Sequence, residues 1–140
     1  MPPATPDARL RMLMRLVEAA AWLVEYIPKI LSYLDPPHSL DELQRDAADP
    51  RDGYQVHHIV ETQYNSNDPA SNWRRFGTRL EAPDNRVSIP YWKHVEISSW
   101  YSTKNKDYGG MTPRAYLRGK SWGVQYKVGL RIMRHFGALK

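Results

Sequence analysis

Two adjacent histidines, His57 and His58, constrain this chain more than any other feature. They lie in the segment GYQVHHIVE, which we interpret as a strand that follows a break at residues 49–53. Because successive side chains of a strand point to opposite faces, the two imidazoles must diverge. Histidine is the commonest protein metal ligand and the usual general base near neutral pH. One imidazole can therefore hold a metal ion while the other acts on water.

A second pattern follows in the segment APDNRVSIPYWKHVEIS. Asn85 is a turn residue that enters a short β-branched stretch, and Pro90 ends it. The same proline opens a predicted helix over residues 91–101, since proline is favoured at the first helical position. His94 would lie in the first turn of that helix. The sequence thus predicts a strand, a second strand and a helix, with histidines on the first strand and on the helix.

This unit resembles the HNH nucleases, which are also called His-Me finger or ββα-metal nucleases. The histidine pair and the nine-residue step from Asn85 to His94 are most similar to the nuclease domains of colicins. They are also similar to the endonuclease-VII-like domains that end bacterial polymorphic toxins. The resemblance covers residues 53–101, extends more loosely to Lys140, and does not include the first fifty residues.

The resemblance implies a role for each residue of the motif. His58 would be the general base that activates a water molecule, and His57 and His94 would be the metal ligands. Asn85 would orient the His58 imidazole, or the strand that carries it, through a hydrogen bond. The expected cofactor is a divalent metal ion, namely Mg²⁺, Mn²⁺, Ni²⁺ or Zn²⁺.

One position departs from the colicin pattern, which has a further histidine one helical turn after the first. Here that position is Ser98. Two imidazoles with water molecules suit an octahedral Mg²⁺, Mn²⁺ or Ni²⁺ better than a closed tetrahedral Zn²⁺ site. Glu61 and Glu96 are carboxylates that would be available to complete the shell.

A histidine pair standing alone is more often a surface feature or a satisfied core group than a catalytic site. The functional interpretation therefore depends on Asn85, Pro90 and His94 following in the right order. The other two histidines, His38 in the turn DPPHS and His135 near the C-terminus, have no such partners. We interpret both as structural or exposed.

Charge is divided sharply along the chain. Residues 1–73 have six Lys and Arg against eleven Asp and Glu, whereas residues 74–140 have fourteen against four. A basic surface with interleaved aromatic residues suits a phosphate backbone, so DNA is the expected substrate, with RNA as an alternative. The candidate phosphate contacts are Arg74, Arg75, Lys93, Lys104, Arg114, Arg118, Lys120, Lys127, Arg131 and Arg134.

Length and composition limit the class of protein. The chain has 140 residues, the size of one domain, and no cysteine, which excludes thiolate zinc sites, cysteine nucleophiles and disulfides. The apolar stretch at residues 12–34 is interrupted by charges and by Pro28, so we expect no membrane span. The N-terminal residues do not resemble a secretory signal. An exported form would therefore depend on an upstream delivery module.

The expected fold is α+β and mainly helical, with a ββα-metal finger core, an N-terminal helical segment at residues 1–50 and a nuclease domain at residues 51–140 that ends in helices. Asp7 is the expected N-cap of a helix over residues 8–27, and Pro28 begins a second helix to Leu34. Ser39 and Glu42 form a capping box. The further expected elements are a helix at 40–47, a polar loop at 62–84, and helices at 112–118 and 121–135.

The sequence favours a metal-dependent nonspecific endonuclease, a DNase that is the C-terminal toxin domain of a bacterial competition system. Such an effector would be secreted or injected, would act in the cytoplasm of the target cell, and would have an acidic immunity protein as partner. Two alternatives remain open. One is a phage or mobile-element HNH endonuclease, and the other is a non-catalytic basic nucleic-acid-binding module.

Overall fold

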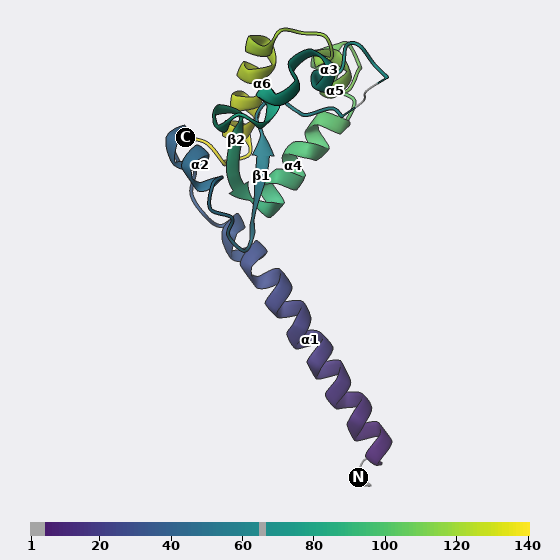
Figure 1. Cartoon of the computed structure of the whole chain (residues 1–140). Helices are drawn as coiled ribbons and strands as arrows, with labels where there is room; N and C mark the ends of the chain where they lie inside the picture. Colours follow the sequence, from purple (N-terminus) through teal and green to yellow (C-terminus); the bar gives the residue numbers. More distant parts are fainter. Residues whose placement is uncertain (1–4, 65–66) are drawn as a thin grey trace.

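The structure, a computed structural model, describes residues 5–64 and 67–140 and has an α+β, mainly helical fold. Figure 1 shows a small body from which one long helix projects. The helices are α1 (Pro6–Tyr33), α2 (Leu40–Asp46), α3 (Asn72–Phe76), α4 (Tyr91–Ser102), α5 (Pro113–Leu117) and α6 (Trp122–His135). The strands are β1 (Tyr54–His58) and β2 (Arg86–Pro90), and the 3₁₀ turns are η1 (Gly77–Glu81), η2 (Pro83–Asn85) and η3 (Lys106–Tyr108).

The predicted succession of strand, strand and helix is confirmed. Strands β1 and β2 form an antiparallel two-stranded sheet in which His57 pairs with Val87 and His58 with Arg86. Helix α4 begins at Tyr91, directly after Pro90, and contacts both strands. His94 is therefore in the first turn of α4, beside the strand that carries the other two histidines.

The core lies between this sheet, α4 and α6 and contains Ile59, Val87, Ile97 and Met133. Helix α6 comes so close to the chain after β1 that a Cβ atom on Gly129 would lie 2.3 Å from the Ile59 carbonyl oxygen. Only glycine fits at this position.

The spacing of this last helix predicts Ser121 as its cap and a core face that includes Val124, Ile132 and Met133. In α6, Ser121 accepts a hydrogen bond from the Val124 amide, and the helix ends at His135 before Gly137. Ile132 and Met133 are buried, whereas Val124 is 45% exposed, so that part of the prediction is wrong. In that first turn the neighbouring Gln125 faces inward instead.

The N-terminal helix differs from the prediction in two ways. Its N-cap is Thr5 rather than Asp7, and it continues through Pro28 as one helix. A proline removes one amide donor from the helix, and packing at its base compensates for that loss. The Ser32 hydroxyl donates to the Gly53 carbonyl at 2.7 Å, and a Cβ on Gly53 would lie 2.3 Å from the Pro28 carbonyl oxygen.

The predicted polar loop at residues 62–84 is also wrong in part, since it contains α3, η1 and most of η2. Its polar residues cap and fill these short elements. Asn72 is fully buried and exchanges two hydrogen bonds with Gln125, at 2.8 and 2.9 Å. Buried amide pairs of this kind give a segment the composition of a loop although it is folded.

Helix α2 belongs to the body. The predicted N-cap at Ser39 is confirmed, since its hydroxyl accepts from the Glu42 amide at 3.3 Å; that hydroxyl also donates to the Glu42 carboxylate at 3.0 Å, in place of the backbone bond of a capping box. Leu43 is buried in the core, and His38 forms a bridge to Leu139. Within the first fifty residues, the part that stands apart is therefore α1 (Figure 1). Consistent with the sequence, none of the helices in the described parts of the chain has the length and hydrophobicity to cross a membrane.

Candidate active site

All three motif histidines border one cavity of about 280 Å³, which opens where β1, the chain after it, α4 and α5 meet. The resemblance described above implied that these three histidines would share one site. The cavity is lined by His57, His58, Glu61, Thr62, Gln63, His94, Ser98, Tyr101 and Arg114.

His57 and His94 form the inner wall of the cavity. Their ring centroids are 5.3 Å apart with the rings at 70°. Burial, followed by the nearby His94 and His58, lowers the pKa of His57 to about 3, and burial also lowers the pKa of His94. Both imidazoles are therefore neutral near pH 7, which is the form that binds metals.

The buried Nε2 atom of His57 has no hydrogen-bond partner in residues 5–64 and 67–140. Burying an imidazole nitrogen without a partner costs free energy, and such an atom requires an explanation. A ligand bound between His57 and His94 would provide one.

His58 faces a different partner. Its Nε2 atom lies 3.1 Å from Glu81 Oε1, and the Tyr64 hydroxyl donates to the same oxygen at 3.0 Å. Both hydrogen bonds lower the pKa of Glu81, the one from His58 more than the one from Tyr64, so the carboxylate is ionised. A carboxylate only accepts, so Nε2 is the nitrogen that carries the proton in the neutral His58 ring, which leaves the lone pair on Nδ1.

Sequence reasoning missed Glu81 as a site residue. It is 23 residues from His58, in a segment that we expected to be a loop, and no spacing rule connects the two positions. The turn η1 brings the carboxylate to the histidine. Only the folded chain identifies this pair.

Asn85 orients the chain after the histidine strand and makes no hydrogen bond to the His58 imidazole. Its side chain accepts from the Val60 amide at 2.8 Å and donates to the carbonyls of Val60 and Leu80, at 3.1 and 3.0 Å. Its own carbonyl accepts from the Ile59 amide at 3.0 Å. Of the two predicted roles, the observed contacts therefore match the one that fixes the strand.

We expect Asn85→Ala to destabilise the fold by about 3–5 kcal/mol, because three buried hydrogen bonds are lost and their backbone partners remain unsatisfied. Urea unfolding would measure the change. The matched control is Asn105→Ala, which removes one cap bond, to the Asp107 amide, and should cost about 1 kcal/mol. Equal losses in the two variants would contradict the proposed role of Asn85.

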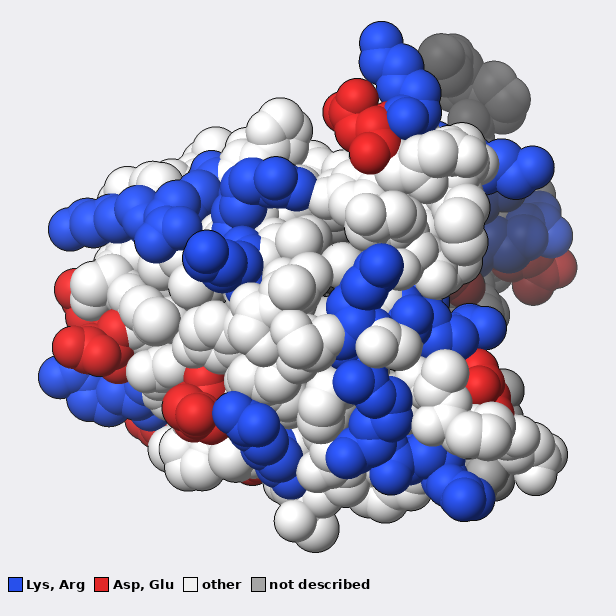
Figure 2. Space-filling model, turned by 90° about the horizontal axis from the view of Figure 1, so that it is seen from above, with Lys and Arg blue, Asp and Glu red and all other residues white. Residues whose placement is uncertain are grey.

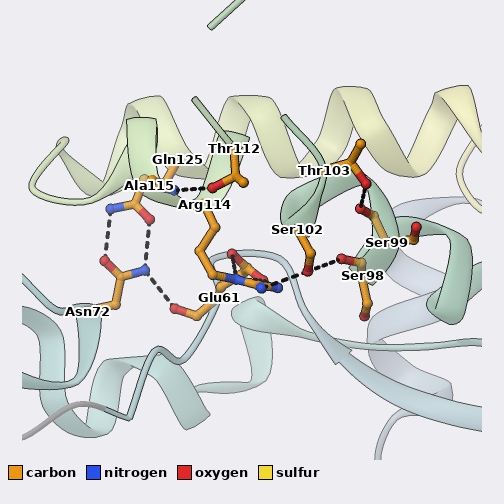
Figure 3. A network of polar contacts seen from close by, with 10 residues as sticks. All are labelled: Glu61, Asn72, Ser98, Ser99, Ser102, Thr103, Thr112, Arg114, Ala115 and Gln125. Atoms are coloured by element: carbon orange, nitrogen blue, oxygen red, sulfur yellow. Dashed lines mark hydrogen bonds and ion pairs between the residues drawn. The ribbon is translucent and has the colours of Figure 1, made fainter. Parts of the chain in front are cut away.

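Glu61 and Arg114 form the outer wall. Arg114 Nη2 lies 2.6 Å from Glu61 Oε2, its Nε contacts both carboxylate oxygens at 3.1 Å, and Nη1 donates to Ser102 at 2.8 Å (Figure 3). Burial raises the pKa of Glu61, and the arginine opposes that rise. The pair thus holds a guanidinium at the rim of the histidine cavity, where the sequence had predicted a phosphate contact.

The two spare carboxylates do not complete a metal shell. Glu61 is engaged by Arg114, and Glu96 accepts from the Tyr33 hydroxyl on α1, outside the cavity. Among the described residues, no group of three or more histidine and acidic side chains is placed to hold a metal ion. Of the residues that the sequence suggested as ligands, the neutral pair His57 and His94 is the part that lies together in the cavity.

One predicted phosphate contact is wrong. Lys93 is only 6% exposed and donates to the carbonyls of Asp35 and Gly137, at 2.7 and 2.8 Å. It ties α4 to the chain after α1 and to the C-terminal turn. Lys93 is next to His94 in the first turn of α4, and adjacent residues of a helix point about 100° apart. The two side chains therefore face different directions, and that of Lys93 enters the body.

The other predicted cations differ in availability. Arg118 pairs with Asp68 at 3.4 Å, and Arg75 donates to the Lys120 carbonyl. Lys104 and Lys120 are exposed, and Arg74 lies in the last turn of α3. The structure therefore brings Arg114 to the histidines but distributes the remaining basic residues over the surrounding surface.

Figure 2 shows the end of the molecule opposite α1, where Lys and Arg clearly outnumber Asp and Glu. In Figure 1 this end carries α3, α5 and the start of α6. The excess of cations in residues 74–140 thus produces a basic surface on the body. Such a surface attracts polyanions over about a Debye length.

Comparisons of the chain with protein-family models, with curated proteins and with solved structures give no match.

Proposed function

We propose that this protein is a metal-dependent endonuclease that hydrolyses phosphodiester bonds. The observation that carries the proposal is the convergence of His57 and His94, both neutral, beside the pair His58 and Glu81 at the edge of a strand, strand and helix unit. This arrangement supplies two histidines that could bind one metal ion and a separate general base within one cavity. The ββα-metal finger suggested by the family resemblance has the same division of labour.

His58 is the proposed general base. With Nε2 donating to Glu81, Nδ1 has the lone pair that accepts a proton from water as the water attacks phosphorus. The ionised Glu81 carboxylate fixes the ring and stabilises the imidazolium that forms. General acid–base catalysis of this kind contributes about 10²–10⁴-fold in rate.

His57 and His94 would hold the divalent ion. When bound, such an ion neutralises charge on the scissile phosphate and on the departing 3′ oxygen. The unpartnered Nε2 of His57 supports this assignment, and two imidazoles with water suit Mg²⁺, Mn²⁺ or Ni²⁺. Arg114, held at the rim by Glu61, would bind a phosphate oxygen and position the backbone in the cavity.

The proposed substrate is DNA, bound without sequence preference. The basic surface in Figure 2 supports a contact with the phosphate backbone, which supplies most nonspecific affinity. We propose further that the chain is a toxin domain delivered into a target cell and neutralised by an acidic immunity protein. The family resemblance and the net charge of +5 support that part of the proposal.

The direct test is incubation of the full chain with supercoiled plasmid in Mg²⁺, Mn²⁺, Ni²⁺ or Zn²⁺, each with and without a chelator. We expect nicked and linear products with at least one metal and none after chelation. His38→Ala is the matched control, because this half-buried histidine pairs with Glu42 away from the cavity, so cleavage should be unchanged. Binding without cleavage in every metal would refute the enzyme and leave a nucleic-acid-binding module.

A further inference from the structure

Helix α1 exposes an apolar surface that the described body does not cover. Most of its large hydrophobic side chains are between 40% and 76% exposed, with Tyr33 and Val24 at the two limits. Figure 1 shows the helix projecting away from the body and meeting it only at its C-terminal end. An isolated helix in water is marginally stable, and most helices depend on packing of an apolar face.

The accessible surface of the chain is also large for its mass. A compact monomer of 16.3 kDa would expose about 7,500 Å², whereas this chain exposes 9147 Å². The excess of roughly 1,600 Å² resembles the total area of a standard protein interface, to which each partner contributes about 800 Å². Helix α1 therefore exposes enough area for a stable association.

One set of apolar residues in α1 follows a heptad pattern, with steps that alternate between three and four residues, while others such as Leu16, Trp22 and Leu23 lie off it. This spacing places a continuous seam on one side, as in coiled coils. The seam residues are Leu10, Leu13, Val17, Ala20, Val24, Ile27 and Leu31. Most of the charged residues lie on the opposite side, namely Arg11, Arg15, Glu18, Glu25 and Lys29.

We propose that α1 pairs with the α1 helix of a second copy of this chain, in antiparallel orientation. Antiparallel helices match one half of the seam with the other half of the partner's seam. Leu10 would pack against Ile27, and Leu13 against Val24, each of them twice because the interface is two-fold symmetric. This alignment overlaps nearly the full length of α1 and leaves few seam residues uncovered.

Charge favours the antiparallel orientation over the parallel one. The free end of α1 carries Arg9, Arg11 and Arg15 against Asp7, whereas at its base Glu25 is balanced by Lys29 and Glu96 of α4 accepts from Tyr33. An antiparallel pair brings the net positive end of each helix toward Glu96 at the base of the other. A parallel pair would bring like charges together, which opposes association.

An apolar groove of about 350 Å³ lies beside the seam at the base of α1, where Ile30 and Leu34, which are outside the seam, border it with Trp92 and Val95 of α4. These α4 residues are on a different side of the helix from His94 and Ser98, which line the histidine cavity. The pairing therefore leaves the cavity open and does not depend on the proposed nuclease activity.

Sedimentation equilibrium of the full chain tests the pairing. We expect a dimer, and Val24→Glu should raise its dissociation constant about 100-fold or more, because two charges enter an apolar seam. Val24 is 76% exposed in the single chain, so this change should not unfold it. Trp22→Glu is the matched control: Trp22 is also exposed but lies opposite the seam, so the dimer should persist.

If Trp22→Glu raises the dissociation constant as much as Val24→Glu or more, the proposal is overturned, since the helices would then associate nonspecifically through their exposed apolar residues. A chain that remains monomeric up to about 100 µM would also overturn it. If that monomer floats with lipid vesicles, the apolar face belongs to a membrane surface instead.

Orientation is tested with a spin label at Ala8→Cys, which is unique because the chain has no cysteine. Ala8 lies away from the seam near the free end. In the antiparallel dimer the two labels would be separated by about 30 Å along the helix axis. Labels within about 20 Å, the width of two helices side by side, would show a parallel pair and overturn the orientation.

Discussion

His58→Ala should lower the rate of plasmid cleavage by about 10²–10⁴-fold, the usual contribution of a general base, while the affinity for metal changes little. The reason is geometric. His58 bonds Glu81 at 3.1 Å on one side of the cavity, whereas His57 and His94, the proposed metal ligands, form its inner wall. Single-turnover cleavage and calorimetric titration of the metal would measure the two effects separately.

Glu81→Gln provides a graded control for the base. The amide oxygen still accepts the hydrogen bond from His58 Nε2, but the charge that stabilises the imidazolium is lost. We expect a smaller loss of rate than in His58→Ala, of roughly tenfold. If His58→Ala cleaves at nearly the normal rate, His58 is not the base and Glu81 has no catalytic partner.

His57→Ala and His94→Ala should each weaken metal binding about 100-fold or more and abolish cleavage at limiting metal. In the proposed site the two imidazoles are the protein ligands, so removal of either would leave a single one. Calorimetric titration with Mn²⁺ and Ni²⁺ would give the affinities. Circular dichroism and urea unfolding would confirm that each variant is folded, which matters most for the buried His57.

Ser98→His is the complementary change. Ser98 lines the cavity one helical turn after His94, so an imidazole there faces the same ion. We expect tighter binding of Ni²⁺ and Zn²⁺, which favour nitrogen ligands, and a smaller change for Mg²⁺. If His57→Ala, His94→Ala and Ser98→His all leave the metal affinity unchanged, His57 and His94 are not metal ligands.

The sequence by itself determined the strand, strand and helix unit. The histidine pair, the turn at Asn85 and the helix opening at Pro90 are local signals, and each acts within a few residues through strand alternation or the conformation of proline. These signals predicted the order of the elements, and the family resemblance that they carry implied the convergence of His57, His58 and His94. The caps at Ser39 and Ser121 were predictable for the same reason, since a cap bond spans three residues.

Only the tertiary structure decided the partners of these residues. Glu81 reaches His58 from 23 residues away, Arg114 reaches Glu61 from 53 residues away, and Lys93 turns inward to carbonyls 44 and 58 residues distant. Contacts at such separations depend on how the whole chain packs, and local spacing contains no signal for them. The same holds for Pro28, because the helix continues through a proline when neighbouring packing offsets the lost hydrogen bond.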